Sequence, residues 1–166
     1  MAASANTVRR TEVLAAELTW VDGRLQREIL VVVEDGVVVA VGSQEELALS
    51  GQCLAVTRRL PGCALLPGMV DSHSHSFQRG LRGVGERYRS ADTSSTFWSW
   101  REGMYELVTG MDEERLYMTT RRCYEEMLAG GVTAVGEFHY LHHPPAAADF
   151  SFDRVILRAA SDAGIR

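Results

Sequence analysis

The chain has 166 residues and is 46% hydrophobic, which suffices for one ordinary core and argues against a chain that is disordered as a whole. Its 22 acidic and 17 basic residues are mixed along the sequence and give a net charge of -5. There is therefore no cluster of basic residues of the kind that binds nucleic acid, and small polar metabolites are favoured as partners. With three cysteines in no Cys-x-x-Cys pattern, no apolar leader and no membrane-length segment, we expect a cytoplasmic protein without a disulfide framework that binds neither nucleic acid nor membrane.

The first part of the sequence predicts a small β layer. Residues 1–10 are expected to be a disordered N-terminus, and residues 11–66 contain short β-rich runs. Two such runs within 28–42 flank Asp35-Gly36, a pair that accepts the positive φ angles of a two-residue hairpin turn. Ser43 then offers an N-cap for a short helical turn. We therefore predict a hairpin followed by one turn of helix.

From Pro67 onward the pattern alternates between strands and helices. The predicted elements, in order, are a strand carrying two histidines, a loop over 77–95, a helix from Phe97, a helix capped by Asp112, a strand over 132–140 and a helix over 152–166. This order predicts parallel strands joined by helical crossovers. In such folds chemistry is found just past the C-terminal ends of the strands.

The two histidines, His73 and His75, suggest half of a metal site. Side chains at i and i+2 of a strand point to the same face, so both imidazoles can reach one metal ion. A pair of partly solvated loop histidines is the alternative interpretation. Further polar residues cluster after the same two strands, namely Gln78, His139, Tyr140, His142 and His143.

The segment 66–75 resembles the first barrel strand of the amidohydrolase superfamily, in which two such histidines bind a catalytic metal. Three further segments, 77–80, 97–102 and 136–143, make the chain similar to the formimidoylglutamate deiminases of that superfamily. These enzymes degrade histidine by hydrolysing N-formimidoyl-L-glutamate to N-formyl-L-glutamate and ammonia. The resemblance implies that substrate as the small-molecule partner.

The resemblance also implies the fold class. We expect an α/β fold that corresponds to the N-terminal part of a metal-dependent amidohydrolase. Residues 11–66 are expected to form a small β-sandwich segment, and residues 67–166 the first two βα units of a TIM-type barrel, which usually has about 250 residues. The remaining ligands and the acid/base residues of the family come from later strands, so we expect them beyond Arg166. The chain is thus expected to be a truncated portion that is inactive by itself, and a homodimer is one option for the full-length enzyme.

The resemblance assigns roles to five residues. His73 and His75 become ligands of one divalent metal ion, taken as zinc, while Gln78, Arg101 and Tyr140 become substrate-binding residues. The chemistry agrees, because neutral imidazoles suit zinc and an open zinc position lowers the pKa of a bound water to about 7. Arg101 also offers the planar two-donor fork that matches a substrate carboxylate.

Several of these residues also have a structural interpretation. The stem of Arg101 can cover the preceding tryptophan, Tyr140 can occupy an amphipathic rim, and Gln78 can be an ordinary loop amide. Glu137 is expected to form a structural hydrogen bond, with a general base as the alternative. Three further histidines are expected at the rim of the site or behind the ligands, namely His139, His142 and His143.

Two other functions stay open at this point. One is a related metal-dependent amidohydrolase that deaminates cyclic amidines or purines, for which a carboxylate-binding Arg101 would be unnecessary. The other is a non-catalytic fragment that uses an exposed sheet edge to bind a complementing chain.

Overall fold

The computed structural model divides the chain into two compact units, Met1–Pro67 and Gly68–Arg166, which are described separately. Only the backbone is described for 97–99, and the predicted disorder of 1–10 falls, except for residue 10, outside the described residues. Among the described residues, no helix is both long and apolar enough to cross a membrane. The described residues are 10–51, 54–83, 97–144 and 149–166.

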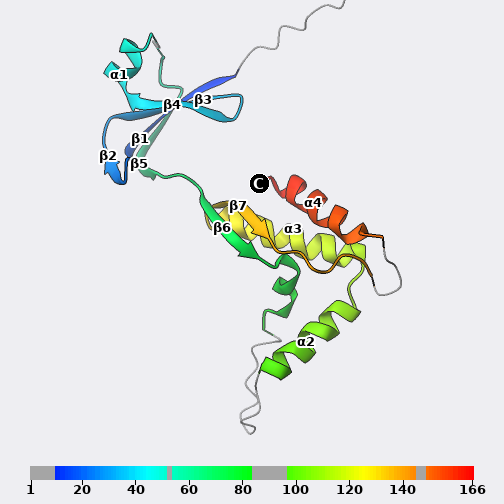
Figure 1. The fold of residues 1–166 in the computed structure, drawn as a ribbon. Coiled ribbons are helices and arrows are strands. Elements are labelled where there is room, and N and C mark those ends of the chain that lie inside the picture. The colour runs from blue at the N-terminus through cyan, green and yellow to red at the C-terminus, as the bar shows by residue number, and fades with distance from the viewer. Residues whose placement is uncertain (1–9, 52–53, 84–96, 145–148) are drawn as a thin grey trace, which may run out of the picture. The chain divides into compact units, whose positions relative to one another are not determined.

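The N-terminal unit is built on a five-stranded sheet (Figure 1). Its order is β2-β1-β3-β4, with β5 pairing in parallel with β1. The predicted hairpin is confirmed, because β3 and β4 pair antiparallel across Asp35 (φ 48°) and Gly36 (φ 83°). The strands are β1 Thr11–Val21, β2 Arg24–Gln26, β3 Ile29–Glu34, β4 Val37–Ser43 and β5 Arg58–Leu65.

A short helix, α1 (Gln44–Leu49), closes the core of this unit. The predicted Ser43 cap is confirmed: the Glu46 amide donates to Ser43 Oγ at 3.2 Å, and the Ser43 amide donates to Glu46 Oε2 at 2.7 Å. The cap directs the helix so that Leu47 reaches the apolar face of the sheet. The buried cluster there consists of Val13, Leu30, Val32 and Leu47.

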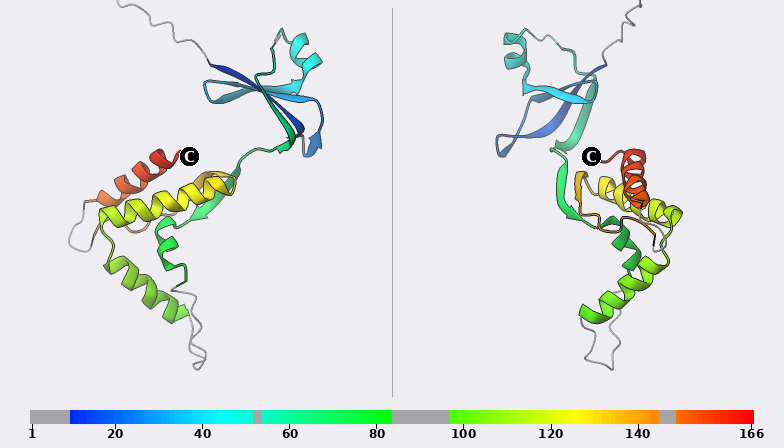
Figure 2. Two further views of the ribbon diagram at one scale, coloured as in Figure 1. Left: turned by 180° about the vertical axis from the view of Figure 1, so that it is seen from behind. Right: turned by 45° about the vertical axis from the view of Figure 1, so that its right-hand side comes forward.

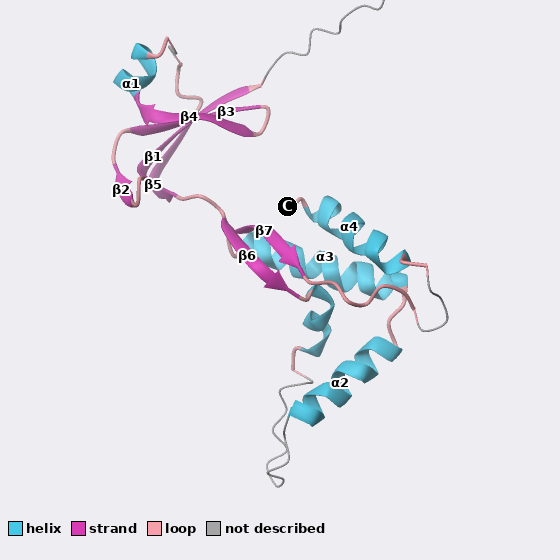
Figure 3. Ribbon diagram, in the orientation of Figure 1, coloured by secondary structure: helices cyan, strands magenta, loops and turns pink. Residues whose placement is uncertain are grey.

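The C-terminal unit combines two parallel strands with helices (Figures 2 and 3). The parallel pairing predicted from the alternating pattern is confirmed, and α3 and α4 pack against each other. Arg166 continues the sheet on β7, since the Arg166 amide donates to Thr133 O at 3.1 Å and the Val135 amide donates to Arg166 O at 2.7 Å. The elements are β6 Met69–Ser74, η1 Ser76–Leu81, α2 Phe97–Thr109, α3 Glu113–Ala129, β7 Val132–Glu137 and α4 Ser151–Ala163.

Several predictions in this unit are wrong in their extent. The strand predicted to carry both histidines ends at Ser74, before His75, and the helix predicted over 152–166 is α4, Ser151–Ala163. The predicted loop over 77–95 begins as the 3₁₀ helix η1, in which the Gln78 amide donates to His75 O at 2.9 Å, and its residues 84–95 lie outside the described residues. The strand predicted over 132–140 ends at Glu137. The Phe138 amide still donates to Ser74 O of β6 at 2.8 Å, but the Phe138 carbonyl oxygen lies 2.8 Å from a side-chain atom, His75 Nδ1. The predicted Asp112 cap of α3 is confirmed, with the Arg115 amide donating to Asp112 Oδ1 at 2.8 Å.

Glycine permits the close approach of β6 and β7. A Cβ added to Gly136 would lie 2.7 Å from the Ser72 carbonyl oxygen, closer than side-chain carbons normally approach a backbone atom. The strands therefore meet at their C-terminal ends only because position 136 has no side chain. Around the helices that pack nearby, the buried core consists of Phe77, Met111, Leu116, Phe152, Val155 and Ile156.

Candidate metal centre

His73 and His75 lie together at the C-terminal end of β6. The strand ends at Ser74, so His75 is the residue immediately after it, yet the two side chains still point to the same side. Their Nε2 atoms are 3.1 Å apart. Two ligands on one tetrahedral zinc, each bonded at about 2.0 to 2.1 Å, would be roughly 3.3 Å apart, so these nitrogens need little movement to share an ion.

The ring of His75 is oriented by the backbone carbonyl of Phe138, the residue that follows β7. His75 Nδ1 lies 2.8 Å from the carbonyl oxygen of Phe138, and a carbonyl only accepts, so Nδ1 carries the proton. The lone pair is then on Nε2, which faces His73. The Phe138 ring stacks on His73 with centroids 5.6 Å apart. This is the arrangement that orients histidine ligands in metal sites, so the pair fits a divalent metal.

Glu137 holds the backbone that follows His75. Its Oε1 accepts hydrogen bonds from the Ser76 amide at 2.7 Å and from Ser76 Oγ at 2.8 Å, which confirms the structural hydrogen bond expected for Glu137. Ser76 Oγ also lies 3.2 Å from Thr120 Oγ1 on α3. Nearby, burial, followed by the charge of Glu137, raises the pKa of the Tyr124 hydroxyl. A buried polar network thus joins the histidine turn to β7 and α3.

Gln78 and Tyr140 are neighbours of His75. Gln78 Nε2 donates to Tyr140 Oη at 2.5 Å, and the Tyr140 ring lies edge-on to His75 with centroids 5.1 Å apart. The Tyr140 hydroxyl donates in turn to the sulfur of Met104 on α2 at 3.5 Å. The structure therefore brings four of the predicted site residues into one contact group.

Arg101 lies on α2, one helical turn before Met104. Residues three apart on a helix share a face, so Arg101 stands on the side of α2 that meets Tyr140. Its Nε donates to Tyr105 Oη at 2.7 Å, and its guanidinium lies 5.2 Å from the centroid of that ring. Both of these contacts are with a residue of the same helix, one turn further along.

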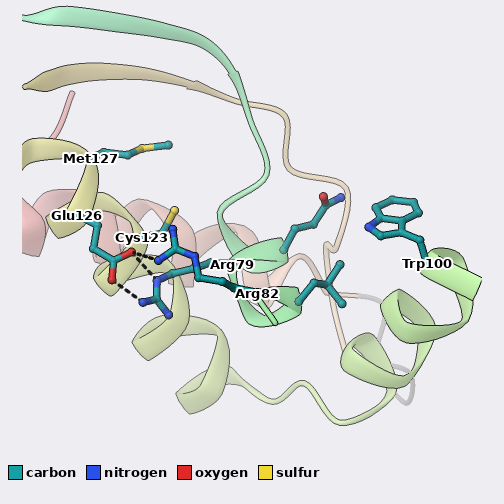
Figure 4. Close-up of a pocket in the computed structure, with 8 residues that line it drawn as sticks. Arg79, Arg82, Trp100, Cys123, Glu126 and Met127 are labelled. Carbon is teal, nitrogen blue, oxygen red and sulfur yellow. Dashed lines mark hydrogen bonds and ion pairs between the residues drawn. The ribbon is translucent and has the colours of Figure 1, made fainter. Parts of the chain in front are cut away.

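A cavity of about 490 Å³ lies beside Gln78. In Figure 4, Arg79, Arg82 and Glu126 lie together on one side of it and Trp100 of α2 lies on the other. Arg79 Nε donates to Glu126 Oε2 at 2.9 Å, and this hydrogen bond is the main reason that the pKa of the Glu126 carboxyl falls to about 2. The arginines on this wall are therefore already paired with an acidic residue.

Sequence reasoning missed two features of the site. The Phe138 carbonyl has no side-chain signal, because any residue at that position supplies the same oxygen. His139 and His142 contact Asp153 of α4 rather than the His73 and His75 pair. Side chains alternate between the two sides of an extended segment, and this alternation is the sequence signal that could have placed His139 on the side opposite Phe138 and Tyr140.

Comparisons with known proteins place these residues in a family context. The model of the Amidohydrolase family matches residues 64–166. Formimidoylglutamate deiminase of Pseudomonas aeruginosa is 42% identical over 108 residues, covering 63% of this chain and 23% of that enzyme. Imidazolonepropionase of Salinispora tropica is 34% identical over 113 residues, covering 67% of this chain and 27% of that enzyme. The chain thus spans about a quarter of the length of these relatives.

Solved structures of amidohydrolases also resemble this chain. An amidohydrolase from Brucella melitensis has a TM-score of 0.75 at 30% identity, covering 93% of this chain and 33% of that one. A mutant of the atrazine chlorohydrolase TrzN from Arthrobacter aurescens, solved with zinc and atraton, has a TM-score of 0.70 at 26% identity, covering 93% and 34%. These likenesses confirm the predicted fold class, with the chain matching a portion of an α/β amidohydrolase.

Proposed function

This chain belongs to the amidohydrolase family, and from that premise we propose that it supplies the first metal-binding and substrate-binding residues of a formimidoylglutamate deiminase. The reaction would be the hydrolysis of N-formimidoyl-L-glutamate to N-formyl-L-glutamate and ammonia. The convergence of the His73 and His75 Nε2 atoms, with Gln78 and Tyr140 beside them, is the observation that carries this proposal.

We propose that His73 and His75 hold a divalent metal ion, with zinc as the identity that their chemistry favours. Neutral imidazole nitrogens are zinc ligands, and the Phe138 carbonyl keeps the lone pair of His75 on the atom that faces His73. A relative of known structure contains zinc. When bound, such an ion acts as a Lewis acid and lowers the pKa of a coordinated water to about 7.

The proposed substrate is linear and carries two carboxylates, and the neighbouring side chains suit it. The Tyr140 hydroxyl now donates to a thioether sulfur, which is a weak acceptor, so it can turn to a stronger acceptor on the substrate at little cost. Gln78 supplies an amide within reach of that hydroxyl. Arg101, one turn along α2 from Met104, supplies a guanidinium fork for a carboxylate.

A chimera tests this function directly. The matched segment of the Pseudomonas aeruginosa deiminase would be replaced by this chain, and ammonia release from N-formimidoyl-L-glutamate would be measured. We expect turnover in the chimera, its loss with His73→Ala, and a fall in kcat/KM of about 100-fold with Arg101→Met, because a charged hydrogen bond contributes roughly 1.5 to 3 kcal/mol.

A matched control uses another arginine of the same unit. Arg122→Met removes an exposed guanidinium that pairs with Glu126, and it should leave kcat/KM unchanged. Turnover of purine or cyclic amidine substrates instead, with no effect of Arg101→Met, would favour the other deaminases of the family. A zinc-free chimera with no turnover would contradict the proposal and favour a non-catalytic role in binding a complementing chain.

A further inference from the structure

The segment after β7 sends its side chains in two directions. Phe138 and Tyr140 both contact the ring of His75, with centroid distances of 5.6 and 5.1 Å. His139, between them, contacts His142 instead, with ring centroids 5.7 Å apart. This is the alternation of an extended chain, in which successive side chains point to opposite sides. A second group of imidazoles therefore forms on the side facing α4.

Asp153, in the first turn of α4, meets both of these imidazoles. Its Oδ1 lies 2.9 Å from His142 Nδ1 and 3.4 Å from His139 Nε2. One ligand atom of each residue, the two ring nitrogens and the carboxylate oxygen, all lie within 4.8 Å of one another. Three ligands of a tetrahedral zinc would be separated by roughly 3.3 Å, so the group needs only small side-chain rotations to surround an ion.

His139 is the member of this group that requires a partner. Its side chain is 10% exposed, and neither of its ring nitrogens forms a hydrogen bond among the described residues. A buried polar group without a hydrogen bond destabilises the folded state, so native structures rarely leave one unsatisfied.

We propose that His139, His142 and Asp153 form a second binding site for a divalent transition metal. Two imidazoles and one carboxylate are a ligand set typical of zinc, with a water or the second carboxylate oxygen as the fourth ligand. The site shares no residue with the His73 and His75 pair, and it does not depend on the proposed deiminase activity. Its ion joins the segment that follows β7 to α4.

The backbone around the three residues already has the required shape. The Phe152 amide donates to the His142 carbonyl oxygen at 3.1 Å, which fixes the loop against the start of α4. The Ser151 amide donates to Asp149 Oδ1 at 3.0 Å, so the approach to the helix is held as well. Asp153 follows one residue after Phe152, and the ion would be bound by side chains on a preformed frame.

Zinc binding by the whole 166-residue chain tests the proposal. The background is His73→Ala/His75→Ala, which removes the first pair, and bound zinc is measured by mass spectrometry after equilibrium dialysis. We expect roughly one zinc ion per chain. His142→Ala and Asp153→Asn should each weaken binding more than about 10-fold, since losing even an outer partner of a ligand costs about 10- to 100-fold.

The neighbouring histidine is the matched control. His143 Nδ1 faces the Pro144 carbonyl oxygen rather than the group, so His143→Ala should leave zinc binding unchanged. His142 and Asp153 are 44% and 37% exposed, so their variants are expected to fold, and far-UV circular dichroism would check this. If the double variant does not fold, the same single variants in the unchanged chain should each lose one of the bound ions.

The opposite results would overturn the proposal. It fails if the double variant binds no zinc at micromolar concentrations, in which case the group is an ordinary ion pair between Asp153 and His142. It also fails if zinc binding survives both His142→Ala and Asp153→Asn. Cobalt substitution gives a second measurement, because visible absorption of the bound ion should disappear with Asp153→Asn and persist with His143→Ala.

Discussion

The two units differ in what they bury. In the described part of the N-terminal unit, Thr19 is the single buried polar residue and the core is aliphatic. Among its described residues, the C-terminal unit buries four polar side chains close to its histidines, namely Ser74, Ser76, Thr120 and Ser151. An aliphatic core stabilises a sheet without fixing any one side chain, whereas a hydrogen-bonded interior fixes orientation. Substitutions in the first unit should therefore change stability, and those in the second should change metal affinity.

The largest expected effect is a loss of stability with no effect on metal binding. Leu30 is 7% exposed in the aliphatic core, so Leu30→Ala should lower the free energy of unfolding by about 2 to 5 kcal/mol. Urea denaturation measures this change, and chelator competition measures zinc affinity, which should stay the same. Leu49→Ala, at a residue 83% exposed in the same unit, should shift stability by less than about 0.5 kcal/mol. A fall in zinc affinity with Leu30→Ala would break the contrast.

The next effect concerns the strand contact beside the histidines. Gly136→Ala places a methyl carbon 2.7 Å from the Ser72 carbonyl oxygen, so β6 and β7 must separate. Overpacking of this kind costs about 1 to 3 kcal/mol and should also displace His73, with measurable loss of the zinc bound by the His73 and His75 pair. Gly103→Ala is the control, because its added Cβ meets nothing within 4 Å and alanine favours the helix. Normal zinc binding in the Gly136 variant would contradict the importance of this contact.

A smaller change is expected at Glu137, which acts on His75 through Ser76. Glu137→Ala removes the acceptor of two hydrogen bonds, and the zinc affinity of the His73 and His75 pair should fall by about 10- to 100-fold. Glu137→Gln keeps an acceptor oxygen and should restore most of the affinity, which a purely electrostatic role would not allow. The exposed Glu125→Gln, which loses only a pairing with Arg121, serves as the control in the same titration.

The smallest effect is a pH dependence on the arginine-lined wall. The hydrogen bond from Arg79 lowers the pKa of Glu126 from 4.5 to about 2 in the folded protein. Because the folded pKa is the lower one, the stabilisation is complete above pH 4.5 and is lost as the pH falls toward 2. Glu126→Gln should reduce the slope of stability against pH in this window, as followed by thermal unfolding. An unchanged slope would show that the pair is screened by solvent.

Local sequence signals predicted the elements that depend on local interactions. Asp35-Gly36 determines its hairpin through backbone φ angles, and the caps at Ser43 and Asp112 are bonds between residues three apart. His73 and His75 come together because side chains two residues apart share a side of an extended backbone, although β6 itself ends at Ser74. In each case the determining contacts lie within a few residues.

The features that were missed depend on contacts between distant parts of the chain. β7 ends at Glu137, and the carbonyl of the next residue, Phe138, bonds to the His75 side chain, a contact that spans 63 residues. The 3₁₀ helix after His75 has no hydrophobic periodicity of its own and is fixed by the burial of Phe77 and Leu81. Asp153 reaches the histidines from α4, which packs on α3, so this contact also depends on tertiary packing.

The hydrogen bond from His75 to the Phe138 carbonyl has a consequence for mutagenesis. Every amino acid at position 138 carries this oxygen, so alanine scanning across the segment would find Phe138 important for ring packing alone. For the same reason, evolutionary substitution of Phe138 would keep the hydrogen bond that orients the His75 imidazole. Replacing the amide that follows Phe138 with an ester, which weakens the carbonyl as an acceptor while keeping every side chain, would reveal a determinant that genetic substitution cannot reach.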